Sequence, residues 1–132
     1  MKLLLDTHIF LWAAKAPERL TAAEHGLLAR REVRPIVSSV TIWELRIKWN
    51  SFHPSGDRKG EFDPAEAIEY ARRDGIELAA LQPEDCAVIL VSPVRLGDPF
   101  DEMLLVHAQQ LGARLLTRDR LLLEHPLAWR FA

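Results

Sequence analysis

The sequence predicts an α/β protein in which a parallel β-sheet of about four to five strands is flanked by helices on both faces. Short apolar runs alternate with segments of helical periodicity along the whole chain, as in parallel sheets that are covered by helices. The 132 residues suit one domain, and a composition of 48% hydrophobic and 27% charged residues is typical of globular proteins. We therefore expect a single domain spanning residues 1–132.

The amino-terminal half contains two predicted strands and three predicted helices. The apolar run Lys2–Leu5 and the segment Pro35–Ser38 have the length and composition of buried strands. Thr21 and Glu24 have the spacing of a capping box at the start of the second helix. The three helices are expected at His8–Ala14, Thr21–Arg31 and Thr41–Lys48.

The carboxy-terminal half begins with a polar loop at Asn50–Phe62, which contains Gly, Pro and charges of both signs. Asp-Pro pairs at Asp63 and Asp98 mark two helix starts, because Asp caps a helix and Pro fits its first turn. Gly75 and Gly112 mark the ends of these helices. Further strands are expected at Ile76–Leu81, Arg114–Thr117 and, as an edge strand, Trp129–Phe131, and further helices at Pro83–Ser92 and from Asp119 to Pro126.

Charge and apolar content restrict the environment and the partners of the chain. With a formal net charge of −2, any nucleic acid must be held by a local basic patch or by bound cations. Asp6 ends the first apolar run, and no stretch approaches the ~20 apolar residues of a membrane span, so we expect a cytoplasmic protein with no membrane partner. The single cysteine, Cys86, fits a reducing compartment, and its apolar neighbours predict a buried thiol within a helix.

Four acids lie at or near the points where predicted strands pass into helices: Asp6, Glu44, Asp101 and Asp119. Open α/β sheets bind ligands beyond the carboxyl ends of their strands, so these side chains are expected to meet there. Clustered like charges are unfavourable without a cation, and an all-oxygen donor set favours Mg²⁺ or Mn²⁺. Such a cation activates water and stabilises charge on phosphoryl oxygens. The acids therefore predict hydrolysis of a phosphate ester.

Each acid also has a structural interpretation. Asp6 and Asp119 are favoured helix N-caps, and Asp101 would complement a helix dipole. Glu44 follows Thr41 by three residues, as in a capping box. Capping acids collect at strand-to-helix junctions, so the residues alone leave both interpretations open.

Four stretches of the chain resemble PIN-domain ribonucleases of the VapC toxin type. They are KLLLDTH at 2–8, VSSVTIWELRIK at 37–48, DPFDEMLLVHA at 98–108 and LLTRD at 115–119. Their order and separations also match, so the resemblance spans nearly the whole chain. It implies a PIN-like fold, Mg²⁺- or Mn²⁺-dependent cleavage of RNA, and a toxin that a cognate antitoxin holds inactive in a type II toxin–antitoxin pair.

The resemblance also implies roles for particular residues. Asp6, Glu44 and Asp101 match the acidic metal positions of the family, and Asp119 matches its fourth acid, so all four are candidate catalytic and metal-binding residues. Thr7 and Thr117 match positions that support the site. Four cationic residues close in sequence to the acids are candidate contacts for RNA phosphates: Arg46, Lys48, Arg118 and Arg120.

The tryptophans of the early helices, Trp12 and Trp43, exceed what a small core needs. Aromatic residues anchor interfaces, and the resemblance offers two uses for them, a homodimer and a clamp for the antitoxin. We expect the homodimer.

The chain also departs from the family pattern. Glu102 stands where a basic residue usually follows Asp101, Leu96-Gly97 replaces a usual His-Arg pair, and the loop after Trp49 is longer. A catalytically silent PIN-like module that binds protein or RNA is the alternative function, against which the four intact acids argue.

Overall fold

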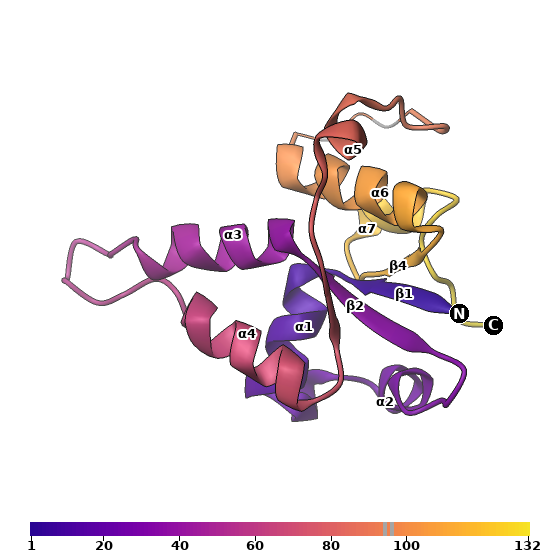
Figure 1. Ribbon diagram of the computed structural model, residues 1–132. Coiled ribbons are helices and arrows are strands. Elements are labelled where there is room, and N and C mark those ends of the chain that lie inside the picture. Colours follow the sequence, from indigo (N-terminus) through magenta and orange to yellow (C-terminus); the bar gives the residue numbers. More distant parts are fainter. Residues whose placement is uncertain (94, 96) are drawn as a thin grey trace.

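A four-stranded, all-parallel sheet in the order β3-β2-β1-β4 forms the centre of the molecule. The computed structural model describes residues 1–93, 95 and 97–132. Strand β1 lies between β2 and β4 (Figure 1), and β3 pairs with the other side of β2 at the edge of the sheet. The strands are β1 (Lys2–Leu5), β2 (Arg34–Ser38), β3 (Glu77–Ala79) and β4 (Arg114–Leu116).

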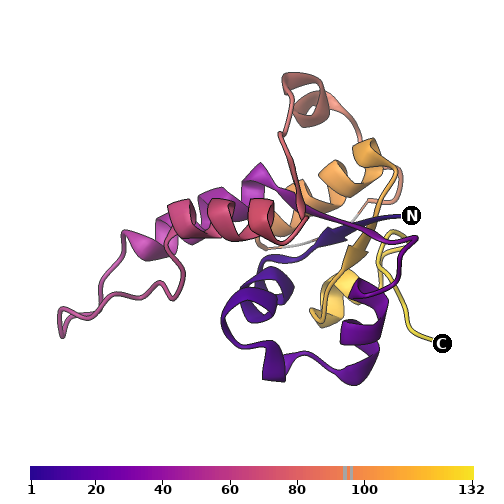
Figure 2. The ribbon, with the colours of Figure 1, turned by 60° about the horizontal axis from the view of Figure 1, so that its bottom comes forward.

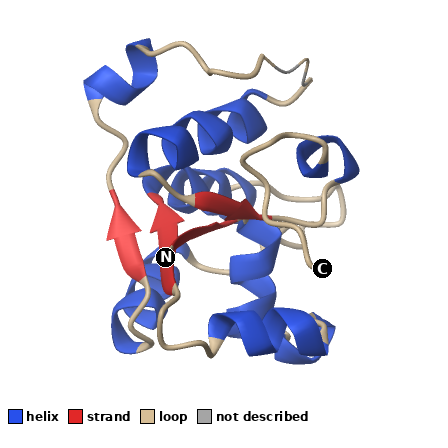
Figure 3. Ribbon diagram, turned by 90° about the vertical axis from the view of Figure 1, so that its right-hand side faces the viewer, coloured by secondary structure: helices blue, strands red, loops and turns tan. Residues whose placement is uncertain are grey.

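Helices surround the sheet, as Figure 3 shows in blue, and confirm the predicted α/β class. The predicted capping box starts α2: the Glu24 N–H donates to Thr21 Oγ1 at 3.1 Å, and the Thr21 N–H donates to Glu24 Oε1 at 2.7 Å. No helix in the described part of the chain is long and apolar enough to cross a membrane. The helices are α1 (Thr7–Lys15), the 3₁₀ turn η1 (Pro17–Arg19), α2 (Ala22–Leu28), α3 (Ser39–Trp49), α4 (Pro64–Arg73), α5 (Pro83–Ala87), α6 (Pro99–Leu111) and α7 (Arg120–Leu123).

The alternation of side chains along β1 divides the interior into two cores, one on each face of the sheet. Leu3 and Leu5 pack on one face together with residues of α1, α2 and α4, including Phe10. Leu4 packs on the other face together with residues of α6 and α7, including Leu105. Figure 1 shows these two groups of helices on opposite sides of the sheet, and in Figure 2 the helices α1 and α2 (indigo to purple) lie below strand β1. Because helices cover both faces of the sheet, strand β1 is apolar and fully buried from Leu3 to Leu5.

The helix expected at 83–92 is shorter than predicted, and Cys86 is exposed rather than buried. Val88 has extended backbone angles, and α5 ends at Ala87. The side chain of Gln109 then binds the following backbone, accepting from the Val91 N–H at 2.7 Å and donating to the Ile89 carbonyl at 3.0 Å. The apolar run after Cys86 is therefore a segment tied to α6, with only Leu90 of it buried.

Two predicted strands also need correction. The third strand covers only Glu77–Ala79, and Trp129–Phe131 is not a strand. Near the carboxy terminus a single parallel bridge joins Ala128 to Leu115, and the Trp129 N–H donates to the Leu115 carbonyl at 2.8 Å. Leu96, which belongs to one of the departures from the family pattern, lies outside the described residues.

Residues 50–62 form an arm that projects beyond the ends of α3 and α4 (Figure 1). A bridge pairs Phe52 with Arg58, and the Arg58 guanidinium lies over the rings of Trp49 (4.2 Å) and Phe52 (4.8 Å). Gly60 brings the returning segment against α3, since a Cβ on Gly60 would lie 2.6 Å from the Trp49 Cα. The predicted loop is thus ordered by its own contacts.

Gly60→Ala should destabilise the protein by about 1–3 kcal/mol, because the added methyl group meets backbone atoms that cannot move aside. Gly26→Ala is the matched control: a Cβ at that position would meet nothing within 4 Å, and alanine favours the helix interior. Urea denaturation of both variants checks this. A Gly60→Ala variant as stable as the parent would show that the arm does not pack on α3 in solution.

Candidate active site

The carboxyl ends of β1, β2 and β4 lie at one edge of the sheet, and the predicted acids follow them. Asp6 comes directly after β1, and Asp119 comes three residues after the end of β4. Glu44 lies on α3, which follows β2, and Asp101 lies in the first turn of α6. Parallel pairing therefore brings residues from distant parts of the chain to the same edge.

Asp6 is held by the segment that follows β4. Its Oδ2 accepts a hydrogen bond from Thr117 Oγ1 at 2.7 Å, and its backbone N–H donates to the Leu116 carbonyl at 2.9 Å. Asp6 stands at the N-cap position of α1, yet its side chain makes no capping hydrogen bond there. With 8% of its surface exposed, it is a buried carboxylate fixed by a hydroxyl group rather than a helix cap.

Glu44 is held by a residue that follows β1. Thr7 Oγ1 donates to Glu44 Oε1 at 2.8 Å and lies 3.1 Å from Thr41 Oγ1. The capping-box interpretation of Thr41 and Glu44 is wrong, because α3 starts two residues earlier than expected, at Ser39, and Ser38 caps it. Glu44 therefore lies in the second turn of α3 and faces the end of β1.

Asp119 and Asp98 are genuine helix caps, and Asp101 is not. Asp119 Oδ1 accepts from the N–H groups of Leu121 (2.9 Å) and Leu122 (3.2 Å), while its own N–H donates to Thr117 Oγ1 at 3.0 Å. Asp98 caps α6 in the same manner, because its Oδ1 accepts from the Phe100 N–H at 2.9 Å. Capping uses one carboxylate oxygen in each residue, so the second oxygen of each remains available to a ligand.

All four predicted acids line one cavity of about 460 Å³, and a fifth, Asp98, joins them. Asp98 was expected only as a cap; its position three residues before Asp101, at a helix start beside the same sheet edge, is the signal that could have placed it at the site. The cavity is lined by Asp6, His8, Ile9, Trp12, Glu44, Ile47, Lys48, Asp98, Phe100, Asp101, Arg118 and Asp119.

Burial and mutual repulsion raise the pKa values of three of these carboxyl groups, those of Asp6, Glu44 and Asp101. The pKa of Glu44 rises to about 7, chiefly through burial and further through the charges of Asp6, Asp98 and Asp101, against the opposing hydrogen bond from Thr7. Burial, together with neighbouring acids, raises the pKa of Asp101 to about 6. Burial also raises the pKa of Asp6, although the Thr117 hydrogen bond opposes it. The cations that line the cavity therefore do not offset the cost of ionising these three acids together.

The donor chemistry of this cavity fits a hard divalent cation, because its five acids offer only carboxylate oxygens. The raised pKa values of Glu44 and Asp101 also indicate a place where a cation would replace protons. In the described part of the chain, however, no three His, Cys, Asp or Glu side chains are already gathered at ligating distance. Chemistry and position fit the ion, and small side-chain movements must complete its ligand set.

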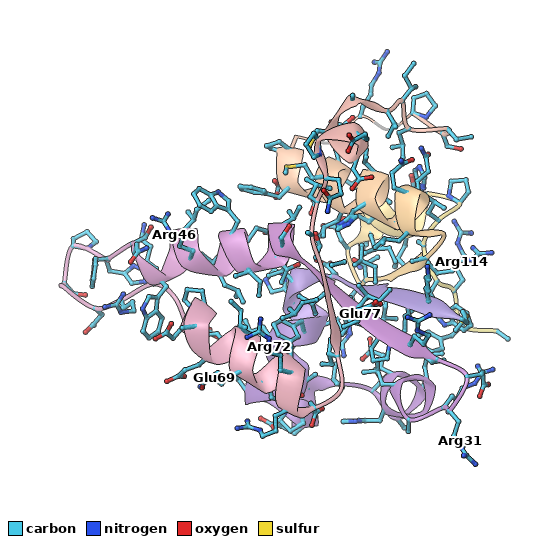
Figure 4. The ribbon with its side chains drawn as sticks, viewed as in Figure 1. Arg31, Arg46, Glu69, Arg72, Glu77 and Arg114 are labelled. Atoms are coloured by element: carbon cyan, nitrogen blue, oxygen red, sulfur yellow. The ribbon has the colours of Figure 1, made fainter. Side chains whose placement is uncertain are left out.

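The four predicted RNA contacts have different surroundings. Lys48 and Arg118 line the cavity, whereas Arg46 lies over the Trp43 ring at 4.7 Å near the arm (Figure 4). Arg120 is exposed in α7 and is not among the cavity residues.

Arg118 has a structural contact: its Nε donates to Oε2 of Glu24 at 2.8 Å. Glu24 is buried and lies 94 positions away in the sequence. Its guanidinium also lies 4.5 Å from the Trp12 ring centroid. These contacts hold the segment between Thr117 and Asp119 against α1 and α2. Arg118 therefore positions neighbours of the acids, whatever else it binds.

Comparisons with known proteins agree with this fold. Residues 3–126 match the family model described as PIN domain. Seven chains of solved structures match; one belongs to the crystal structure of VapBC2 from Rickettsia felis bound to a DNA fragment from their promoter. The likeness covers 97% of this chain and 96% of that chain, with a TM-score of 0.61 and 15% sequence identity, and it shows a shared fold. No curated protein has significant sequence similarity to the chain. Because the family model covers nearly the whole chain, the protein belongs to the PIN domain family.

Proposed function

We propose that this protein is a metal-dependent endoribonuclease and the toxin of a type II toxin–antitoxin pair. The observation that carries the proposal is the cavity at the carboxyl edge of the sheet, which five carboxylates line and in which the pKa values of Glu44 and Asp101 rise to about 7 and about 6. Neighbouring carboxylates destabilise one another's charged forms, and a bound cation removes this repulsion. Such a group of acids is therefore typical of a cation-binding site. The substrate class, RNA, comes from the resemblance of the four acid-bearing stretches to VapC-type nucleases.

Asp6, Glu44, Asp101 and Asp119 would hold Mg²⁺ or Mn²⁺. When bound, the ion supplies positive charge for the phosphoryl oxygens and increases the acidity of water. Thr117 and Thr7 keep the carboxylates of Asp6 and Glu44 directed toward the cavity through their hydrogen bonds. Lys48 at the cavity rim provides a cation for the incoming phosphate backbone.

Two observations support the antitoxin partner and the second copy of the chain. The fold is shared with a chain of the VapBC2 crystal structure from Rickettsia felis, which agrees with the resemblance to VapC-type toxins. The outer side of α3 and the arm expose large apolar side chains, with Trp43 50% and Phe52 53% exposed. Exposed aromatic residues are typical anchors of protein interfaces. We place a homodimer contact at Trp43 and Phe52, and we assign the protein to the cytoplasm, where RNA and antitoxin meet.

Asp6→Asn and Asp101→Asn should each lower RNA cleavage by about a hundredfold or more, since an amide brings no charge to hold the ion. Asp6→Asn should still fold, because the amide oxygen can accept the Thr117 hydrogen bond. The parent should cleave RNA with Mg²⁺ or Mn²⁺ and stop when EDTA is added. Rates on a labelled RNA, with thermal melts of each variant, provide the measurement.

Glu69→Gln is the control for these variants, because Glu69 is exposed on α4, away from the cavity (Figure 4). It should cleave like the parent. Cleavage that survives complete chelation would contradict the metal mechanism. A folded parent that cleaves no RNA with either ion would favour the catalytically silent alternative.

The stability of the metal-free protein should fall as the pH rises from about 4.5 to about 7. Glu44, whose ordinary pKa is 4.5, has a folded-state pKa of about 7, and Asp101 is raised to about 6. The folded state therefore binds more protons than the unfolded state in this pH window. The stability that these protons contribute is lost as the pH rises past the pKa values of the folded state. Glu44→Gln should flatten the fall, because its amide does not titrate and can still accept from Thr7.

Melting temperatures in EDTA between pH 4.5 and pH 8 measure this slope. Glu69→Gln should keep the parental slope, and Mn²⁺ should restore stability at the alkaline end by replacing the lost protons. If Glu44→Gln retains the full slope, Glu44 is not the residue that carries it.

Light scattering should report about twice the chain mass of 15.1 kDa. Replacing Trp43 and Phe52 together by Ser should yield monomers, since both apolar anchors are then lost. Leu121→Ser, at a residue of similar exposure on α7, should leave the mass unchanged. A parent that remains monomeric at tens of micromolar would remove the dimer from the proposal.

A further inference from the structure

A second cavity, of about 280 Å³, adjoins the acid-lined cavity and has the opposite charge. The two share His8, Trp12 and Lys48 in their walls. The second cavity is otherwise built from the underside of α1, the η1 turn, the end of α3 and the returning segment of the arm. It is thus where the arm meets the candidate active site.

Three cations line this second cavity: Arg19, Lys48 and Lys59. One carboxylate, Glu61, lines it as well, so the lining carries a net positive charge. Lys48 and Lys59 are exposed, and among the described residues neither forms a salt bridge. The first cavity, in contrast, sets five acids against Lys48 and Arg118. A cation-rich pocket therefore lies directly beside an acid-rich one.

Arg19 is held in place by the tryptophan that both cavities share. Its guanidinium carbon lies 4.7 Å from the Trp12 ring centroid, and that of Arg118 lies 4.5 Å from the same centroid. A guanidinium stacked on an aromatic ring keeps its edge N–H groups available for an oxyanion. Trp12 thus orders a cation in each of the two cavities.

The position of Lys59 depends on the absence of a side chain at the next residue. Gly60 lies so close to the end of α3 that its Cβ would be 2.6 Å from the Trp49 backbone and 2.9 Å from the Lys48 carbonyl carbon. The Lys59 N–H also donates to the Ser51 carbonyl at 2.9 Å, across the arm. These contacts bring Lys59 to the same pocket as Lys48, although the arm leaves the body of the protein between them.

We propose that the second cavity is a phosphate subsite for single-stranded RNA, next to the site of cleavage, and that the arm is part of the RNA-binding surface. The inference rests on the proposed function, since an RNA strand whose scissile phosphate enters the acid cavity presents its neighbouring phosphate to the adjoining pocket. A chain with a net charge of −2 needs such a local patch to hold nucleic acid.

The test measures the affinity of a short labelled single-stranded RNA as a function of salt, without Mg²⁺ or Mn²⁺, so that no cleavage occurs. Lys59→Ala and Arg19→Ala should each weaken binding and reduce the slope of log affinity against log salt by about 0.7, the loss of one phosphate contact. Arg19→Lys should retain part of the affinity, because the charge is kept. The variants should raise KM for RNA more than they lower kcat, and calorimetric Mn²⁺ binding should be unchanged, since neither residue lines the acid cavity.

Arg31→Ala is the matched control, an exposed arginine on the far side of the molecule (Figure 4), and it should bind RNA like the parent. If the parent cleaves RNA but Lys59→Ala and Arg19→Ala bind it unchanged, the subsite is wrong and the nuclease proposal stands. RNA that binds through Lys59 and is never cleaved supports the subsite and contradicts the nuclease. A parent that binds no RNA, or that binds a labelled polyglutamate peptide through Lys59 in preference to RNA, overturns the subsite.

Discussion

The repulsion between carboxylates at the end of a parallel sheet is the constraint on which the site depends. The segments that follow β1, β2 and β4 each contribute an acid, and burial at this edge makes their shared charge costly. Hydroxyl groups offset that cost: Thr117 donates to Asp6, and Thr7 donates to Glu44. Each of these bonds joins segments that follow two different strands. The polar network of the site is therefore also a set of ties between the elements that carry it.

Trp12 separates an acidic region of the surface from a basic one. Trp12 stands in the wall between an acid-lined and a cation-lined cavity, and two arginines lie against its ring. Arg118 is fixed further by the buried Glu24 of α2. Side chains of α1 and α2 thereby hold the two arginines in place, whereas hydrogen bonds between the segments that follow the strands hold Asp6 and Glu44.

The sequence predicts the strands and helices well where caps and apolar runs coincide, as in Lys2–Leu5 and in the helices that start after Asp63 and Asp98. It predicts the end of α5 poorly. The backbone after α5 is bound by the side chain of Gln109, a residue about 20 positions further along the chain. The shared cavity of the four acids follows from parallel topology. The positioning role of Arg118 depends on its tertiary contact with Glu24, and the pocket beside the arm depends on the close approach of Gly60 to α3. Local sequence patterns do not predict either contact.

The hydrogen bond between Asp6 and Thr117 joins residues 111 positions apart. During synthesis on the ribosome, the first aspartate of the site emerges well before its hydroxyl partner, which follows the last strand, β4. The central strand also lacks its β4 neighbour until then. For an enzyme that would degrade RNA, this order has a consequence: a nascent or truncated chain carries acids without an assembled site. Under the proposed function, activity would therefore appear only once β4 and Thr117 have been synthesised, when the preceding elements are already available to fold.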